Sequence, residues 1–314
     1  MPRIGTSDLD VHPLGLGGNT FGMTTDAETS EEVLDAFVAG GGDFVDTADS
    51  YSFWVPGNTG GESETIIGQW MRSRGNRDEV VVATKVSGHP EFKGLAPDNI
   101  ANAANASLKR LQTDHIDLYY AHYDDESTPL VESLAAFDSL VRAGKVRYVG
   151  VSNYSAERVA EWISVAQENG FAPPVALQPN YSLVNRRDYE RDLADLAERH
   201  RLGVFPYFSL ASGFLTGKYR TADDLEGAAR GAAVKPYMNE AGLKVVSTLE
   251  SVASARGASI ATTALAWLLA KPTVTAPLAS ATTIAQLSDL LAAPELRLNA
   301  DEVAVLDEAS RPFT

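Results

Sequence analysis

Short runs of apolar and often β-branched residues recur along the chain, and most are followed by a segment whose apolar residues have helical spacing. Several runs are apolar at nearly every position, as in EVVVATKV at 79–86 and IDLYYAHY at 116–123. Such continuous runs are typical of parallel strands that are buried on both faces. The runs predict eight strands, at 14–17, 43–48, 79–86, 116–123, 146–153, 175–182, 203–209 and 273–279.

Helical patterns lie between these strands, and residues typical of helix ends mark their limits. Ser30 and Ser155 stand where a side chain caps a helix start, while Gly144 and Gly170 stand where a helix ends. Pro129 suits a first helical turn. The predicted helices are 30–41, 62–74, 97–112, 129–144, 155–170, 187–201 and 260–271, with two more near 283–293 and 301–310.

The alternation of strands and helices predicts an α/β fold, specifically a (β/α)8 TIM barrel, with an open doubly wound sheet as the alternative. The spacing is even and no linker interrupts it, so a single domain over residues 1–314 is expected. An N-terminal hairpin at 4–12 is expected to cover the bottom of the barrel. A long connection at 210–236 follows strand seven, and loops longer than about 15 residues in a compact domain are usually functional.

Composition removes several classes of function. The chain carries 26 Lys and Arg against 42 Asp and Glu, a formal net charge of −16, which argues against a nucleic-acid or anionic-membrane partner. It has no cysteine, so disulfides, thiolate nucleophiles and Cys-ligated metals are excluded. No apolar run has the length of a signal peptide or a membrane span, so a cytoplasmic location is expected.

Polar residues stand at the predicted carboxyl ends of the strands, where active sites of such barrels lie. Lys85 interrupts an apolar run, and its charge is costly there unless a carboxylate pairs with it. Asp46 ends the neighbouring strand, so an ion pair of Lys85 with Asp46 is expected. Tyr51 can reach the same spot, where the ammonium would lower its pKa. With His122 on the next strand, the set could protonate a substrate oxygen.

Each of these residues also has a structural explanation when taken alone. Lys85 could form a purely structural ion pair, and Asp46 could cap a loop. Tyr51 could pack, and His122 could be a core histidine with its hydrogen bonds satisfied. Their combination on three adjacent strands is what favours chemistry.

The same residues make the chain resemble the aldo-keto reductase superfamily, in a bacterial type similar to the branch of the voltage-gated potassium channel beta subunits. DTADSY at 46–51, Lys85 in ATKV and His122 in YYAHYDD match the four catalytic positions of that family. Three further motifs look like its strand-five signature, its strand-six signature and its cofactor loop: LVRAGKVRYVGVSNY at 140–154, LQPNYSLVNR at 177–186 and LASGFLTGKY at 210–219. In order, the motifs cover essentially the whole chain.

The resemblance implies a nicotinamide dinucleotide, NADPH rather than NADH, bound without a Rossmann domain. GLGGNTFG at 15–22 agrees, because Thr20 replaces the last glycine of the dinucleotide fingerprint. By resemblance, the cofactor residues are Ser152, Asn153 and Gln178 for the carboxamide, Tyr207 for the nicotinamide face, Ser209, Leu210, Ser212, Gly213 and Lys218 for the pyrophosphate, and Ser280, Thr282 and Gln286 for the adenosine ribose or its 2′-phosphate, with Gly18, Asn19 and Arg230 as further contacts.

Two positions depart from the family pattern. Phe208 and Ser209 stand where many relatives have Ser-Pro, so the backbone of that loop is expected to differ. Thr283 stands where many NADPH-preferring members carry Arg or Lys, which weakens the case for strong NADPH selectivity. Arg230 in the long connection would supply a positive charge instead.

The resemblance further implies reversible reduction of an aldehyde or ketone to an alcohol. Hydride leaves C4 of the nicotinamide, Tyr51 protonates the oxygen, Lys85 and Asp46 tune that tyrosine, and His122 positions the carbonyl. One alternative is a nucleotide-binding sensor with little turnover, as in the channel beta subunits. The other alternative is a hydrolase. The scattered histidines and the lack of two facing acids argue against a hydrolase, and no metal site is expected.

The expected substrate is a small carbonyl compound. Phe21, Phe53, Trp54 and Phe92 fall in variable loops and are expected to form either an aromatic pocket for an apolar compound or ordinary loop packing. The outer helices show no heptad pattern, so a monomer or a weak homo-oligomer is expected.

Overall fold

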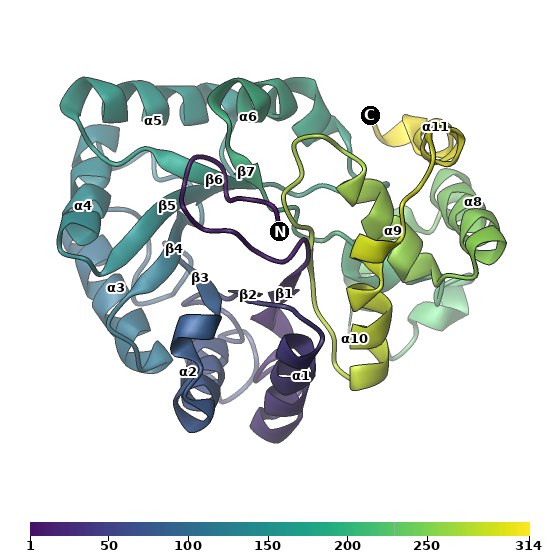
Figure 1. Cartoon of the computed structure of the whole chain (residues 1–314), viewed down its shortest axis with the longest axis horizontal. Helices are drawn as coiled ribbons and strands as arrows, with labels where there is room; N and C mark the ends of the chain where they lie inside the picture. Colours follow the sequence, from purple (N-terminus) through teal and green to yellow (C-terminus); the bar gives the residue numbers. More distant parts are fainter. Residues whose placement is uncertain (229) are drawn as a thin grey trace.

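The computed structural model describes residues 1–228 and 230–314 and confirms the α/β prediction. Eight parallel strands form one sheet in the order β7-β6-β5-β4-β3-β2-β1-β8, and the helices lie outside it (Figure 1). The strands are β1 (Gly15–Gly17), β2 (Phe44–Asp46), β3 (Val81–Val86), β4 (Ile116–Ala121), β5 (Val146–Ser152), β6 (Pro174–Gln178), β7 (Gly203–Val204) and β8 (Leu278–Ala279).

The two ends of this sheet meet, which distinguishes a barrel from the open sheet that was the alternative. Val204 of β7 forms a parallel bridge with Val274, just before β8. The backbone N–H of Thr275 donates to the carbonyl of Val204 at 2.9 Å, and that of Leu278 donates to the carbonyl of Pro206 at 2.8 Å. These hydrogen bonds close the sheet into a (β/α)8 barrel.

All nine predicted helices are present; the short helix at 231–234 was not predicted, and three further differences stand out. The first begins at Ala27, because Asp26 and not Ser30 is its cap, accepting from the N–H of Thr29. A helix at 240–256 was missed, although Asn239 caps its start and Gly257 ends it. The sixth is preceded by a π-helical turn at 189–193. The helices are α1 (Ala27–Ala39), α2 (Glu62–Arg74), α3 (Pro97–Leu111), α4 (Leu130–Arg142), α5 (Ala156–Asn169), α6 (Ala194–His200), α7 (Gly231–Val234), α8 (Glu240–Arg256), α9 (Ile260–Leu269), α10 (Ile284–Leu291) and α11 (Ala300–Ala309).

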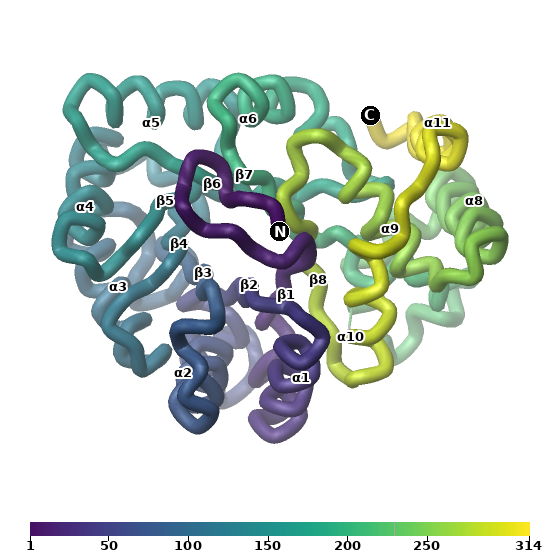
Figure 2. Tube along the Cα trace, viewed as in Figure 1, coloured from purple at the N-terminus to yellow at the C-terminus, as the bar shows by residue number. Residues whose placement is uncertain are grey.

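The N-terminal hairpin covers one end of the barrel, as the sequence predicts (Figure 2). Arg3 and Asp10 form its antiparallel bridge. Its buried residues Ile4, Leu9 and Val11 join a cluster with residues of the barrel interior, including Phe44 and Phe205. The hairpin therefore closes the amino ends of the strands and leaves the carboxyl ends open.

Alternation along β3 explains how a lysine comes to lie inside an apolar run. Side chains on a strand point to opposite faces in turn, so Ala83 and Lys85 share one face and Thr84 takes the other. Ala83 belongs to the interior cluster with Leu118, so Lys85 points into the barrel. Thr84 points outward and donates to Glu64 at 2.6 Å.

Two of the last three strands end several residues earlier than the sequence predicts, and the third, β8, begins later. The predicted strands 175–182, 203–209 and 273–279 correspond to β6, β7 and β8, which pair only over 174–178, 203–204 and 278–279. Beyond Gln178 and Val204 the chain turns away from the regular ladder. The residues released in this way form loops at the open end of the barrel, where the candidate site lies.

Within the part of the chain that the structure describes, no single helix is both long and apolar enough to cross a membrane. Among the described helices, α8 and α9 together have the length and apolar composition of a span, but the chain bends by 95° between them.

Candidate active site

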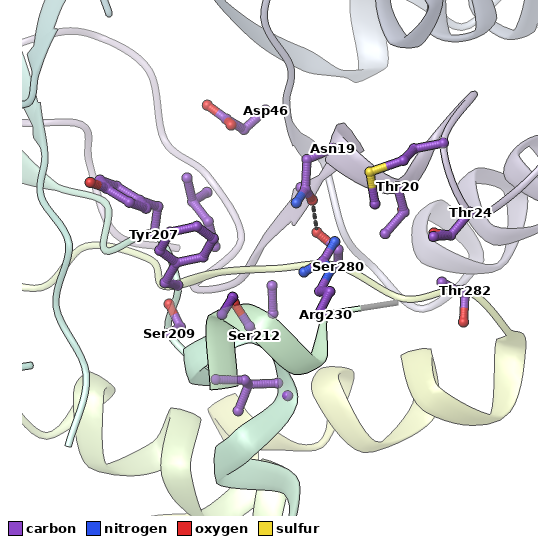
Figure 3. Close-up of a pocket in the computed structure, with 18 of the residues that line it drawn as sticks. Asn19, Thr20, Thr24, Asp46, Tyr207, Ser209, Ser212, Arg230, Ser280 and Thr282 are labelled. Atoms are coloured by element: carbon purple, nitrogen blue, oxygen red, sulfur yellow. Dashed lines mark hydrogen bonds between the residues drawn. The ribbon is translucent and has the colours of Figure 1, made fainter. Parts of the chain in front are cut away.

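A cavity of about 1320 Å³ opens at the carboxyl ends of the strands. Figure 3 shows part of its lining, with Asp46 and Tyr207 toward one end and Thr24 and Thr282 toward the other. Of the residues that the sequence assigns to the site, all but Gly18 and Lys85 line this cavity. Folding thus brings together side chains from both halves of the chain.

Lys85 lies beneath the cavity at the centre of a buried hydrogen-bond network. Its Nζ lies 2.6 Å from Oδ2 of Asp46, and both side chains are almost completely buried, so the expected ion pair is present. Nζ also donates to the backbone carbonyl of Thr47 at 2.7 Å and to the Tyr51 hydroxyl at 3.0 Å. The Tyr51 hydroxyl is itself 3.4 Å from Oδ2 of Asp46. Two neighbouring groups, Lys85 and Asp46, therefore hold the phenol of Tyr51 in one place.

The prediction that Lys85 lowers the pKa of Tyr51 is wrong for this arrangement. Burial raises the pKa of Tyr51 well above its usual range, and the nearby Asp46 carboxylate raises it further. Burial also lowers the pKa of Lys85, a shift that Asp46 opposes. Because Asp46 offsets the ammonium charge, the tyrosine stays protonated, which is the form that a proton donor requires.

His122 follows directly after β4 and faces Tyr51. The two ring centroids are 6.3 Å apart with the planes at 75°. Burial and the Lys85 charge lower the pKa of His122 well below its usual range, so the imidazole is neutral at pH 7. Among the described residues its buried Nδ1 has no hydrogen-bond partner. A neutral imidazole beside a protonated phenol can position a carbonyl oxygen without competing for the proton.

Amide and hydroxyl groups from β5 to β7 connect to this network. Gln178 at the end of β6 donates from Nε2 to Oδ1 of Asp46 at 2.8 Å. Asn153 donates from Nδ2 to the His122 carbonyl at 2.9 Å and accepts from the Tyr207 hydroxyl at 2.6 Å. The Ser152 hydroxyl donates to the Gln178 carbonyl at 2.9 Å. The residues predicted to hold a nicotinamide therefore adjoin Asp46 and His122.

The segment after β7 has an unusual backbone. Phe208, Ala211 and Ser212 have φ of 51°, 47° and 58°, and Gly213 has φ of 93°. Non-glycine residues in this left-handed region are strained and tend to cluster at functional sites. Six of the eight such residues in the described chain lie in loops at this end of the barrel: Ser52, Ser87, Asn153, Phe208, Ala211 and Ser212. The loop at 208–213 thus contains a left-handed turn.

The far end of the cavity is built on α10. Thr283 caps this helix by accepting from the N–H of Gln286 at 3.2 Å, and Gln286 in turn accepts from the N–H of Thr282 at 2.9 Å. The Ser280 hydroxyl donates to Oδ1 of Asn19, the interaction dashed in Figure 3. Lys218 and Arg230 are the cations among the described lining residues, and both come from the connection after β7.

Comparison with known proteins gives the family. A sequence model of the aldo/keto reductase family matches residues 13–311. The chain belongs to the aldo/keto reductase family. Similar proteins include protein tas of Escherichia coli (strain K12), norsolorinic acid reductase B of Dothistroma septosporum, and a probable voltage-gated potassium channel subunit beta of Oryza sativa subsp. japonica. Each is 34% identical to this chain. The matched region covers 99% of this chain and 98% of protein tas, 98% of this chain and 80% of the norsolorinic acid reductase, and 89% of this chain and 86% of the channel subunit. This aldo/keto reductase is an oxidoreductase.

Three residues singled out from the sequence, Gly18, Phe21 and Phe92, do not line the cavity of the reductase, and for Phe21 and Phe92 this favours the loop-packing alternative. Phe21 is fully buried in the core and Phe92 packs against it, so neither forms part of an aromatic pocket. Phe53 and Trp54 do line the cavity. Gly18 is a packing position, because a Cβ there would lie 2.7 Å from the Ser63 hydroxyl.

The sequence also missed several lining residues of the reductase, among them Thr24, Tyr219 and Asp289. Asp289 could have been found, because it follows Gln286 by three positions and therefore shares its face of α10. Thr24 and Tyr219 lie in irregular segments, whose side-chain directions no periodicity reveals.

Asp49 is a second buried carboxyl in the loop that carries Tyr51. It is fully buried, and within residues 1–228 and 230–314 neither of its carboxylate oxygens has a hydrogen-bond partner. Burial raises the pKa of Asp49 well above its usual range, and the charge of Glu64 adds to this shift while Arg110 and Lys85 oppose it. The folded protein therefore favours the protonated carboxyl.

We expect Asp49→Asn to stabilise the reductase at neutral pH. An acid whose pKa rises on folding makes the protein less stable as the pH rises above the pKa of that acid in the unfolded chain, about 3.9 for Asp. The reason is that the unfolded chain then gives up a proton that the folded chain keeps. The neutral amide removes this dependence, for a gain of about 1–3 kcal/mol at pH 7.5 that shrinks toward pH 4.5. Urea denaturation at both pH values measures it, with the exposed Asp78→Asn as control. A gain that is equal at both pH values would contradict the protonated state.

Proposed function

We propose that this aldo/keto reductase reduces an aldehyde or ketone to an alcohol with NADPH as the hydride donor, and that Tyr51 supplies the proton. The observation that supports it is the Tyr51 hydroxyl, 3.0 Å from Nζ of Lys85 and protonated at neutral pH, at the border of a large cavity. Proton transfer by a positioned side chain is worth about 10²–10⁴ in rate. The reverse oxidation uses the same groups.

The residues present fit a dinucleotide. Ligand cavities are commonly about 300–1,000 Å³, and this one, at about 1320 Å³, has room for a dinucleotide and a substrate together. In our proposal, Ser152, Asn153 and Gln178 hold the carboxamide and Tyr207 lies against the nicotinamide face. The strained turn at 208–213, with Lys218 and Arg230, binds the phosphates through N–H groups and two positive charges. Ser280, Thr282 and Gln286 contact the adenosine ribose.

When bound, the dinucleotide would supply the hydride for the carbonyl carbon and would be the group oxidised. The electrons of the carbonyl π bond move to the oxygen, which takes the proton of the Tyr51 hydroxyl. The neutral His122 positions that oxygen, and the Lys85–Asp46 pair stabilises Tyr51 once its proton has left. The products are the alcohol and the oxidised dinucleotide.

The deciding experiment is a titration of the purified protein with NADPH and NADH, followed by steady-state oxidation of the tighter-binding dinucleotide with a panel of aldehydes and ketones. We expect NADPH to bind more tightly and to be oxidised in the presence of at least one carbonyl class. Tight binding without turnover on any carbonyl would instead support the nucleotide-binding sensor, an alternative that the similarity to the channel subunit keeps relevant. Binding of neither dinucleotide would reject both.

We further propose that the enzyme acts as a monomer or weak homo-oligomer in the cytoplasm, without a nucleic-acid or membrane partner. The supporting observation is the net charge of −16, which repels phosphate-rich surfaces and favours solubility.

A further inference from the structure

The exposed aromatic side chains of this protein are concentrated at one place. In the described chain, the aromatic residues among the large exposed hydrophobics are Phe53, Trp54, Tyr123 and Phe208, whose exposed fractions are 40%, 50%, 49% and 46%. All four line the cavity that holds Tyr51. Exposed apolar groups gathered around an opening mark a binding surface, because each leaves hydrophobic area in water until a ligand covers it. We call these four residues the aromatic rim.

The aromatic rim is held in place by contacts with the catalytic and cofactor-facing residues. Tyr123 stacks on His122, with centroids 4.4 Å apart and planes at 18°. Phe208 packs edge-on against Tyr207 at 5.1 Å. Because Tyr123 covers one face of His122 with one of its own faces, its other face is the exposed one. The rim therefore presents ordered ring surfaces next to the proposed reaction centre.

Phe53 and Trp54 form the remaining part of the rim, two and three residues after Tyr51. Their ring centroids are 5.3 Å apart with planes at 80°. The indole N–H of Trp54 is directed at the sulfur of Met23, 3.2 Å away, so its polar atom is occupied. Trp54 thus offers carbon surface and no hydrogen bond to a ligand.

Charge around the rim excludes one large class of substrates. Consider the described lining residues that lie on strands β2 to β6 or on the loops directly after them. The only charged one is Asp46, and its oxygens accept hydrogen bonds from Lys85 and Gln178. The cations Lys218 and Arg230 lie on the connection after β7, which the proposed function assigns to the dinucleotide. Phe208 lies on that same connection, but the loops that carry Phe53, Trp54 and Tyr123 bring no cation to the described lining. A substrate carboxylate or phosphate on those three rings would therefore meet no opposite charge from these loops, and its desolvation would be uncompensated there.

We propose that the substrate is a neutral aldehyde or ketone that carries a planar aromatic system of two or more rings, which stacks on the aromatic rim while its carbonyl oxygen meets Tyr51 and His122. This proposal rests on the proposed function, because it places the reacting carbonyl at Tyr51. Aromatic contacts favour binding beyond the buried area alone, by up to about tenfold for each ring pair.

The test compares 2-naphthaldehyde, butanal and the anionic succinic semialdehyde as substrates of the intact enzyme with NADPH. We expect kcat/KM for 2-naphthaldehyde to exceed that for butanal by at least about tenfold, with succinic semialdehyde lowest. Trp54→Ala should reduce kcat/KM for 2-naphthaldehyde about tenfold and leave that for butanal within about twofold. Val131→Ala removes an exposed apolar group on α4 outside the cavity and should change neither. Equal rates for the two neutral aldehydes, or a preference for the anion, would overturn the proposal.

A binding measurement separates failure of this proposal from failure of the proposed function. Calorimetric titration with 2-naphthalenemethanol, which needs no turnover, should show binding to the wild type and to Val131→Ala, and about tenfold weaker binding to Trp54→Ala. If no carbonyl is reduced but this pattern holds, the function is wrong and the aromatic site stands. If butanal is reduced and the three proteins bind the alcohol equally, the aromatic site is wrong and the function stands.

Discussion

Tyr51→Phe should abolish most carbonyl reduction while dinucleotide binding persists. The substitution removes one oxygen, so the ring keeps its place beside His122. Lys85 loses its 3.0 Å contact with the hydroxyl but keeps Asp46 and the Thr47 carbonyl. We therefore expect a fold like that of the wild type and a loss of about 10²–10⁴ in kcat, the scale of proton transfer by a positioned side chain.

The measurement is NADPH oxidation at saturating carbonyl, together with a fluorescence titration of NADPH binding to the same variant. Tyr148→Phe is the matched control, because it removes a hydroxyl that donates to Asp8 at the opposite end of the barrel, at 2.9 Å. The control should keep both activity and binding. Reduction by Tyr51→Phe within about tenfold of wild type would show that another group supplies the proton.

Lys85→Met is expected to have the largest effect on stability. The Nζ of Lys85 and the carboxylate of Asp46 are 2.6 Å apart, with 0% and 2% of the side chains exposed. Methionine can occupy much of the space of the lysine stem, but it leaves the Asp46 carboxylate buried without a cation. Removing one partner of a buried pair costs about 3–5 kcal/mol, because the remaining charge is uncompensated.

Urea denaturation of the wild type, Lys85→Met and the double variant Asp46→Asn/Lys85→Met measures this effect. We expect the free energy of unfolding to fall by about 3–5 kcal/mol in the single variant and to recover in part in the double variant, where no isolated charge remains. Lys244→Met, on the exposed face of α8, should stay within about 0.5 kcal/mol of wild type. A double variant less stable than the single one would show that the geometry of the pair, and not the isolated charge, dominates.

The local part of the fold was determined by the sequence. Apolar runs and cap residues depend on neighbours within a few positions, so the eight strands, the Ser155 and Thr283 caps and the hairpin at the barrel bottom could all be predicted. The Lys85–Asp46 pair could also be predicted, because a lysine inside an apolar run requires a carboxylate and the neighbouring strand ends in one. The helix α8 was missed although both its ends carried recognisable signals.

Only the tertiary structure decided how far each group is removed from water and which way each loop side chain points. The shift in the pKa of Tyr51 goes opposite to the expected direction because burial and Asp46 outweigh Lys85, and burial is set by strands distant in sequence. The same holds for Asp49, which resembles an ordinary loop residue in the sequence but is buried with no hydrogen-bond partner among the described residues. Loop packing likewise placed Phe21 in the core and Tyr123 and Phe208 at the cavity, since loop side chains follow no periodicity. The sequence alone therefore predicts the barrel and its catalytic candidates, whereas their protonation states and the shape of the pocket require the packed molecule.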